Sequence, residues 1–176
     1  FSWEVGCRRA ESRQLLKSVV ESPLITKTIK VKDEHGNVME KEASYYLTHS
    51  IRCKGKGKTG KVRKFKFTDY SMDAIKKWLE VRGEDECPFV FVIKDANGTR
   101  QLAAETLNQW SSGVITKLLG RRFHPHATRE GRSTAIVVEE GKSVEVAQKL
   151  LGHASSETTR KHYVIVDAEE DESDEL

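Results

Sequence analysis

The hydrophobic period of the chain changes near Asp69, and this change most constrains the fold. Before Asp69, residues 25–31 alternate apolar and polar side chains and are rich in β-branched types, which is typical of a β-strand. Residues 44–53 and 61–67 predict two further strands. Glycine-containing turns join the three segments, so we predict a three-stranded antiparallel sheet.

After Asp69 the apolar residues recur at helical spacing, as Met72, Ile75 and Leu79 do. With the apolar face of residues 8–20, the pattern indicates a mostly helical α+β domain that carries a small three-stranded antiparallel sheet near its N-terminus. A short strand or buried connector is expected at 89–93. Helices are predicted over 8–20, 70–82 (with Asp69 as N-cap), 103–119, 127–139, 143–151 and 156–162, the last four separated by Gly120, Gly141 and Gly152.

Composition limits the class of protein. The chain has 176 residues, 37% of them hydrophobic and 32% charged, which is typical of one globular domain that needs no metal or disulfide to fold. The longest apolar runs, such as 89–93, have only the length of a strand, so no membrane span is expected. Three widely spaced cysteines (Cys7, Cys53, Cys87) fit neither a zinc site nor a disulfide framework and favour a reducing, intracellular setting.

The two ends of the chain suggest a fragment with an acidic tail. The sequence begins at Phe1 without an initiator Met, which predicts a piece of a longer protein. Residues 164–176 contain seven acidic and no basic residues, so 1–163 holds all 30 basic but only 20 of the 27 acidic residues. A basic body with an acidic tail indicates a polyanionic partner, with the tail solvated or competing for the same groove. The alternative is that the tail is only a disordered, solubilising end.

A dense run of basic residues marks the second predicted turn. Eight like charges on a two-stranded ribbon cost stability unless phosphates neutralise them, and glycines here let the turn approach a backbone closely. The alternative is a charged edge that discourages aggregation. The run contains no acid and comprises Arg52, Lys54, Lys56, Lys58, Lys61, Arg63, Lys64 and Lys66.

Two further segments carry groups suited to an anion. Arg8 and Glu11 lie three apart, so the carboxylate can orient the guanidinium, although a surface ion pair would look the same. His126 and Arg129 are also three apart, just after Pro125, and would share a face at the positive end of a helix. A metal site at His124 and His126 lacks a third ligand, and simple capping or packing is the other interpretation.

The last segment joins Leu150-Leu151-Gly152-His153 to Thr158-Thr159-Arg160-Lys161-His162-Tyr163. Gly152 would end one helix and place His153 in the break, with Tyr163 along the next helix. Alone, Tyr163 would be interpreted as an interfacial aromatic with its hydroxyl in water.

In this order, the segments resemble the tyrosine recombinase, or phage integrase, family. Its pattern runs Gly-x-Arg-x-x-Glu, a hairpin Lys, His-x-x-Arg, Leu-Gly-His, Thr-Thr and a nucleophilic Tyr. The resemblance extends from Gly6 to Tyr163. It implies the family's catalytic-domain fold and the cleavage and rejoining of duplex DNA through a 3′-phosphotyrosyl intermediate, with no metal and no nucleotide cofactor.

The resemblance assigns roles residue by residue. It implies that Arg8 and Arg129 bind the phosphate, that His153 donates to it, that His126 is the base and that Tyr163 is the nucleophile. Glu11 would support Arg8. Lys56 would be the hairpin lysine that protonates the leaving oxygen, with Lys54 and Lys58 as rivals in a loop that is two residues longer than expected. The basic residues expected to bind DNA are Arg52, Lys54, Lys58, Lys61 and Arg63.

The resemblance also implies an organisation. Residues 1–166 would be the catalytic domain and 167–176 a flexible acidic tail, with an N-terminal core-binding domain outside this chain. The partner would be duplex DNA, bound as a homotetramer on paired sites by the full-length protein of a prokaryote or phage. Two alternatives stay open: a type IB topoisomerase or telomere resolvase with the same chemistry, and a DNA-binding module without catalysis.

Overall fold

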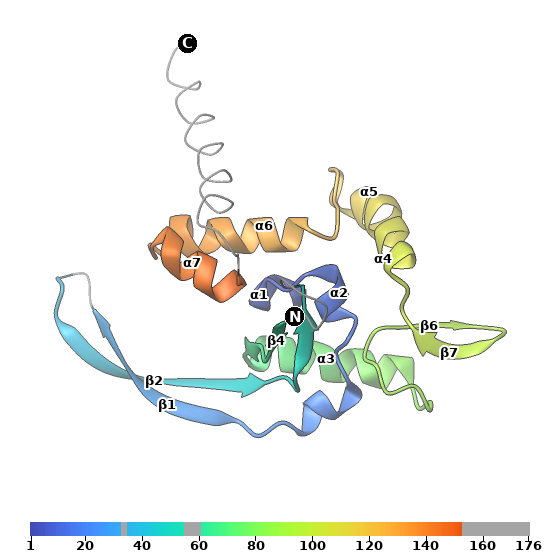
Figure 1. Ribbon diagram of the computed structural model, residues 1–176, viewed down its shortest axis with the longest axis horizontal. Coiled ribbons are helices and arrows are strands. Elements are labelled where there is room, and N and C mark those ends of the chain that lie inside the picture. The colour runs from blue at the N-terminus through green and yellow to red at the C-terminus, as the bar shows by residue number, and fades with distance from the viewer. Residues whose placement is uncertain (33–34, 55–60, 153–176) are drawn as a thin grey trace, which may run out of the picture. The chain divides into compact units, whose positions relative to one another are not determined.

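The computed structural model describes residues 1–32, 35–54 and 61–152, which form two compact units (Figure 1). The first unit comprises Phe1 and Arg13–Ala103 and holds every strand found among the described residues. The second comprises Ser2–Ser12 and the chain from Ala104 onward and is helical in its described part. The fold therefore combines antiparallel strands with a larger share of helix, and the predicted α+β class is confirmed.

A three-stranded antiparallel sheet forms in the first unit, as predicted. Its order is β1 (Ile25–Lys32), β2 (Val38–Leu47), β5 (Lys66–Phe67). The β1–β2 register runs from Ile25 opposite Tyr45 to Lys32 opposite Val38. In Figure 1 these two strands make a long ribbon that extends beyond the other strands of its unit.

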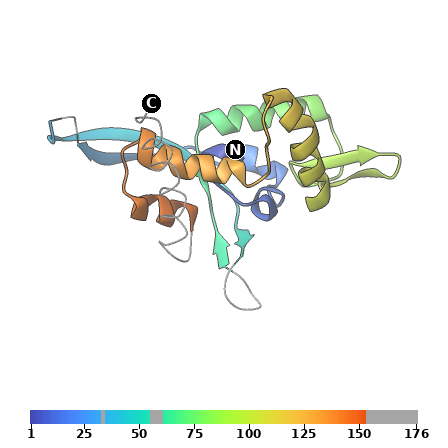
Figure 2. The same cartoon turned by 90° about the horizontal axis from the view of Figure 1, so that it is seen from above.

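The predicted strand bounds were wrong at Thr48, where the second predicted strand breaks. The buried Thr48 receives a hydrogen bond on its side chain from the Phe65 amide (3.0 Å), while its own amide donates to the Phe65 carbonyl (3.0 Å). A side-chain oxygen thus takes a place in the hydrogen-bond ladder. Beyond this break, β3 (Ile51–Cys53) pairs with β4 (Lys61–Arg63) as a separate ribbon, seen in Figure 2.

Helix α3 (Asp69–Arg82) packs one face into the core of the first unit through Met72 and Ile75. The predicted N-cap was wrong by one residue, because Thr68 has the extended backbone of a cap and Asp69 begins the helix. Asp69 instead accepts a hydrogen bond from the Tyr46 hydroxyl (2.8 Å).

The connector after α3 follows the second alternative raised for 89–93. Val90 is fully buried, and the buried Arg82 at the end of α3 donates to the carbonyls of Cys87 (3.0 Å) and Val90 (3.2 Å). The strands come slightly later, as a hairpin of β6 (Val92–Asp95) and β7 (Gly98–Gln101).

The continuous helix predicted over 8–20 was wrong. The segment forms α2 (Arg9–Ser12) and then a 3-10 turn, η1 (Lys17–Glu21). Between them the main chain bonds elsewhere: Lys17 donates to the Pro88 carbonyl (2.7 Å), and the Leu15 carbonyl accepts from the Val90 amide (2.8 Å). These long-range bonds replace the hydrogen bonds of a helix.

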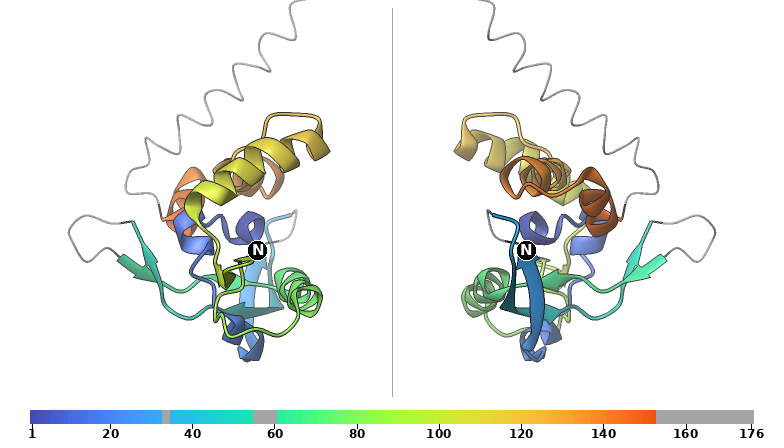
Figure 3. Two further views of the ribbon diagram at one scale, coloured as in Figure 1. Left: turned by 90° about the vertical axis from the view of Figure 1, so that its right-hand side faces the viewer. Right: turned by 90° about the vertical axis from the view of Figure 1, so that its left-hand side faces the viewer.

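The second unit confirms the helices predicted over 103–119, 127–139 and 143–151. Two of the three contain a π-helical turn, and Figure 3 shows α4, η2 and α5 as one continuous coil. The helix predicted over 156–162 lies outside the described residues. In chain order the helices are α1 (Ser2–Val5), α2, α4 (Ala104–Trp110), η2 (Ser111–Ile115), α5 (Thr116–Leu119), α6 (Ala127–Thr134), η3 (Ala135–Glu139) and α7 (Val144–Leu151).

Close backbone packing joins the N-terminal segment to α6 and α7. Gly6 has a left-handed backbone (φ 58°), and a Cβ added there would lie 2.2 Å from Leu151 Cδ2. Only glycine tolerates both conditions without strain. On α6, a Cβ at Gly131 would lie 2.5 Å from the Trp3 ring. The chain around Arg8 is therefore fixed against the two C-terminal helices that the structure describes.

No helix within the described ranges combines the length and the apolar character that crossing a membrane requires.

Candidate active site

Arg8 is held at the start of α2 by Glu11. One carboxylate oxygen lies 3.1 Å from Arg8 Nη1, and the other accepts a hydrogen bond from the Arg8 main-chain amide (2.7 Å). The Glu11 side chain is 1% exposed and that of Arg8 28% exposed. A buried carboxylate thus fixes a cation that still reaches solvent, which is more order than a surface ion pair supplies.

Arg129 occupies the interior of the second unit. The residue is 1% exposed. Its Nη1 donates to the Gly6 carbonyl (2.5 Å) and its Nη2 to the Leu151 carbonyl (2.6 Å). One guanidinium therefore fastens the loop that precedes Arg8 and the last residue of α7. Charge-assisted hydrogen bonds of this kind are among the stronger ones in proteins.

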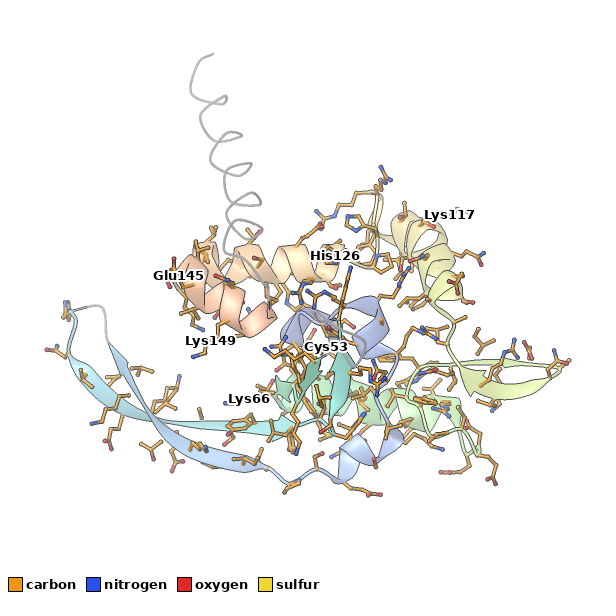
Figure 4. All side chains as sticks on the ribbon, viewed as in Figure 1. Cys53, Lys66, Lys117, His126, Glu145 and Lys149 are labelled. Carbon is orange, nitrogen blue, oxygen red and sulfur yellow. The ribbon has the colours of Figure 1, made fainter. Side chains whose placement is uncertain are left out.

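His126 stands directly before α6, where Figure 4 labels it. Partial burial lowers its pKa from the ordinary value, the nearby Glu130 carboxylate opposes the shift, and the positive charges of Arg129 and Arg8 add to it. A lowered pKa favours the neutral imidazole near pH 7, which is the form that can accept a proton. His124, two residues earlier, pairs with Glu130 at 3.5 Å.

A pocket of about 330 Å³ in the second unit brings together Arg8, His124 and His126. None of the described residues that line it carries a carboxylate. Its volume is near the lower end of the ~300–1,000 Å³ typical of ligand sites, which is enough for a phosphate group. The buried Arg129 is not among the described lining residues. The pocket is lined by Arg8, Arg9, Ala10, Asn108, His124, Pro125 and His126.

Arg9 and Asn108 are pocket residues that the sequence did not reveal. Arg9 Nη1 donates to Asn108 Oδ1 at 2.5 Å, across 99 positions of sequence. The adjacent Arg8-Arg9 pair was a signal for Arg9, because a second arginine beside a phosphate-binding one adds charge to the same place. Asn108 gave no signal, since a polar residue on an amphipathic helix is usually just solvated.

The basic hairpin belongs to the first unit. Arg52, Lys54 and Lys61 are exposed, and Arg63 lies over the Phe65 ring with its Cζ 5.1 Å from the centroid. The Gln14 amide brackets the main chain of Arg52, donating to its carbonyl (2.8 Å) and accepting from its amide (3.0 Å). The base of the hairpin is thus anchored like a paired strand, while Lys56 and Lys58 lie outside the described residues.

His153 and Tyr163 also lie outside the described residues. The chain is described up to Gly152, which ends α7 with a left-handed backbone (φ 68°) and donates from its amide to the Gln148 carbonyl (2.8 Å). The structure thus brings Arg8 and His126 together, with Glu11 and Arg129 supporting them. It leaves Lys56, His153 and Tyr163 as predictions.

Among residues 1–32, 35–54 and 61–152, no group of three or more His, Cys, Asp or Glu side chains could hold a metal ion.

Comparison with known proteins defines the class that this fold and pocket represent. The sequence matches the phage integrase family over residues 3–170, nearly the whole chain. The protein therefore belongs to the phage integrase family.

Curated relatives agree with this assignment. The chain is 26% identical over 173 residues to the SPbeta prophage-derived recombinase-like protein YomM of Bacillus subtilis (strain 168), covering 98% of this chain and 47% of the relative. It is 32% identical over 112 residues to tyrosine recombinase XerC of Erythrobacter litoralis (strain HTCC2594), covering 64% and 35%. The chain thus spans less than half the length of these relatives.

Solved structures share the fold. The XerA recombinase crystal structure matches with a TM-score of 0.60 at 20% identity, covering 92% of this chain and 50% of that one. XerH site-specific recombinase bound to palindromic difH substrate, a post-cleavage complex, matches with a TM-score of 0.62 at 19% identity, covering 99% and 43%.

Proposed function

We propose that this chain is the catalytic domain of a site-specific DNA recombinase or integrase that cleaves and rejoins duplex DNA through Tyr163. The observation that carries the proposal is a pocket whose described lining has no carboxylate and holds both Arg8, oriented by the buried Glu11, and a His126 of lowered pKa. Cationic and neutral donors without competing carboxylates suit one phosphodiester. Family membership supports the same activity.

Arg8 acts on the phosphate. Attack on a phosphodiester adds negative charge to its non-bridging oxygens, and a fixed guanidinium that donates to them stabilises the transition state. A well-placed donor contributes on the order of 3 kcal/mol in such a site. Arg129 and His153 would add donors, with Arg129 also keeping the Gly6 and Leu151 carbonyls in place.

His126 and the hairpin lysine move protons. A tyrosine phenol ordinarily has a pKa of about 10, so the proposed nucleophile needs a base, and a neutral His126 can accept its proton. The phenolate oxygen forms a bond to phosphorus as the bond to the 5′ oxygen breaks, and Lys56 supplies the proton to that leaving oxygen. The 3′-phosphotyrosyl product keeps a phosphoester bond, so rejoining needs neither ATP nor a metal ion.

The proposed partner is duplex DNA, with the exposed Arg52, Lys54 and Lys61 beside its phosphates. Two related structures, of XerH on difH substrate and of the Tn1549 transposon integrase on transposon end DNA, were determined as DNA complexes. We propose that residues 1–166 form the catalytic domain, that 167–176 form an acidic tail, and that the full-length protein works as a tetramer on paired sites.

The experiment that tests this function begins by selecting the DNA sequence that the full-length protein binds from a random pool. A duplex with that site and a nick beside the cleavage position traps a covalent product, because the short cut fragment diffuses away. Wild type should form a protein–DNA adduct and Tyr163→Phe none. Tyr70→Phe, at an exposed tyrosine of α3, is the matched control and should form the adduct normally.

Two other outcomes would assign a different function to the protein. Equal salt-sensitive binding without an adduct for wild type and Tyr163→Phe would indicate a binding module. Efficient relaxation of a supercoiled plasmid that lacks the selected site would indicate a topoisomerase.

A further inference from the structure

The Arg9–Asn108 pair is a feature of the pocket that the proposed chemistry does not use. Arg8 and Arg9 are adjacent, and both line the pocket. Arg8 directly precedes α2 and Arg9 begins it. Their guanidinium groups bond to different partners, Glu11 and Asn108. The proposed mechanism places one phosphate against Arg8 and leaves Arg9 without a role.

The partners of the two arginines differ in charge. Arg8 is bonded to the Glu11 carboxylate, which offsets its charge as it orients it. Arg9 is bonded to a neutral amide oxygen, which orients the guanidinium without offsetting its charge. Arg9 therefore contributes its positive charge to a pocket whose described lining residues hold no carboxylate.

Asn108 adds a donor to the same place. Its Oδ1 accepts from Arg9, so its Nδ2 group, with two N–H bonds, faces away from that contact while the residue lines the pocket. A guanidinium and an amide nitrogen side by side match two oxygens of a phosphate. The pocket's volume of about 330 Å³ exceeds what one phosphate fills.

We propose that Arg9, oriented by Asn108, binds a second DNA phosphate, the neighbour of the phosphate held by Arg8. This inference rests on the proposed function, because it takes the DNA strand in the pocket as given. Arg9 is then a DNA-binding residue that fixes the register of the strand, so that the phosphate to be cleaved falls on Arg8. It reads the backbone and no base.

The test measures affinity for the selected duplex at several salt concentrations with the full-length protein. Each phosphate contact contributes about 0.9 to the slope of log K against log salt. Arg9→Ala should therefore make this negative slope less steep by about 0.9 for every sequence tested, and Arg9→Lys should restore it. Asn108→Asp should also make it less steep, because a carboxylate there offsets the Arg9 charge. Lys149→Ala, at an exposed lysine of α7 outside the pocket, should leave the slope unchanged.

A second measurement locates the contact. Duplexes in which a single phosphate is replaced by an uncharged methylphosphonate are bound by wild type and by Arg9→Ala. Wild type should lose affinity at two adjacent phosphates, and Arg9→Ala should lose sensitivity at only one of them. Sensitivity that stays unchanged in Arg9→Ala would overturn the inference, as would an effect that follows one base pair and ignores the phosphate.

Failure of this inference is distinct from failure of the proposed function. If wild type and Arg9→Ala both form the covalent adduct and their binding has the same salt slope, the recombinase assignment stands and the second phosphate site does not. If wild type forms no adduct but the methylphosphonate scan shows an Arg9-dependent phosphate, the binding site stands and the strand-transfer assignment does not.

Discussion

Arg129 Nη1 donates to the carbonyl oxygen of Gly6 at 2.5 Å, across 123 positions of the sequence. The same guanidinium donates to the Leu151 carbonyl, so the N-terminal segment and the end of α7 are joined through one buried side chain. Arg129, to which the motif assigns phosphate binding, thus also holds together two segments of the second unit.

Replacing Arg129 should therefore cost stability as well as activity. In Arg129→Lys a single ammonium cannot reach both carbonyls, and leaving one buried acceptor unpaired costs about 1–3 kcal/mol. We expect the free energy of unfolding to fall by that amount in urea denaturation. Arg122→Lys, at an exposed arginine of the same unit, should be neutral. Equal stability of the two variants would show that the carbonyl contacts contribute little.

Replacing two different glycines by alanine should change the stability of the protein in opposite directions. Gly6→Ala forces a side chain into a left-handed backbone and toward Leu151 Cδ2, so it should destabilise the second unit by about 2–4 kcal/mol. Gly113 lies in the helical stretch, and a Cβ added there would meet open space, so Gly113→Ala should raise stability by about 0.4–1 kcal/mol. Thermal unfolding of both variants checks the pair, and a shift in the same direction would contradict this difference in packing.

The sequence allowed much of this fold to be predicted, and the errors share a cause. Helices with a clear apolar period and glycine ends, such as the one at 143–151, were predicted well because their signals are local. The helix expected over 8–20 failed because the Leu15 and Lys17 backbone bonds to residues 88–90, which no local pattern encodes. The strand break at Thr48 depends likewise on one side chain that bonds to distant Phe65.

The candidate site was predictable to the extent that its residues fall in short motifs. Arg8 and Glu11 lie three apart, and the structure shows the contact that this spacing allows. Asn108 was not predictable, because its relation to Arg9 arises only when α4 folds beside α2. The burial of Arg129 is equally a product of tertiary packing.

Removing the charge of Glu11 should slow strand cleavage more than it weakens DNA binding. Glu11→Gln keeps an acceptor for the Arg8 main-chain amide but loses the charge that orients the guanidinium. Misplacing a catalytic group by about 1 Å can cost up to ~100-fold in rate, so we expect adduct formation to slow by roughly 10- to 100-fold. Glu21→Gln, at an exposed glutamate of η1, is the control. A rate within twofold of wild type would show that Arg8 needs no orientation by Glu11.

The titration of His126 should report the charges around the pocket. Because burial and then the Arg129 and Arg8 cations lower its pKa, its imidazole signal in NMR should have a midpoint below the ordinary 6.5. Arg8→Ala removes a positive neighbour and should raise the midpoint, whereas Glu130→Gln removes a negative one and should lower it. Assignment comes from the signal lost in His126→Gln.

The direction of the same shift fixes how stability depends on pH. The folded pKa of His126 lies below 6.5, the ordinary value that holds for the unfolded chain. At a pH between these two pKa values the unfolded state binds more protons than the folded state. The contribution of His126 to stability is therefore fully present above pH 6.5 and is lost as pH falls through the folded pKa. Urea unfolding of wild type and His126→Gln between about pH 5 and pH 8 measures this contribution, and the gap between the two proteins should shift against wild type as the pH drops. The opposite trend would mean that His126 is protonated in the folded pocket, and such a residue could not take the proton of Tyr163.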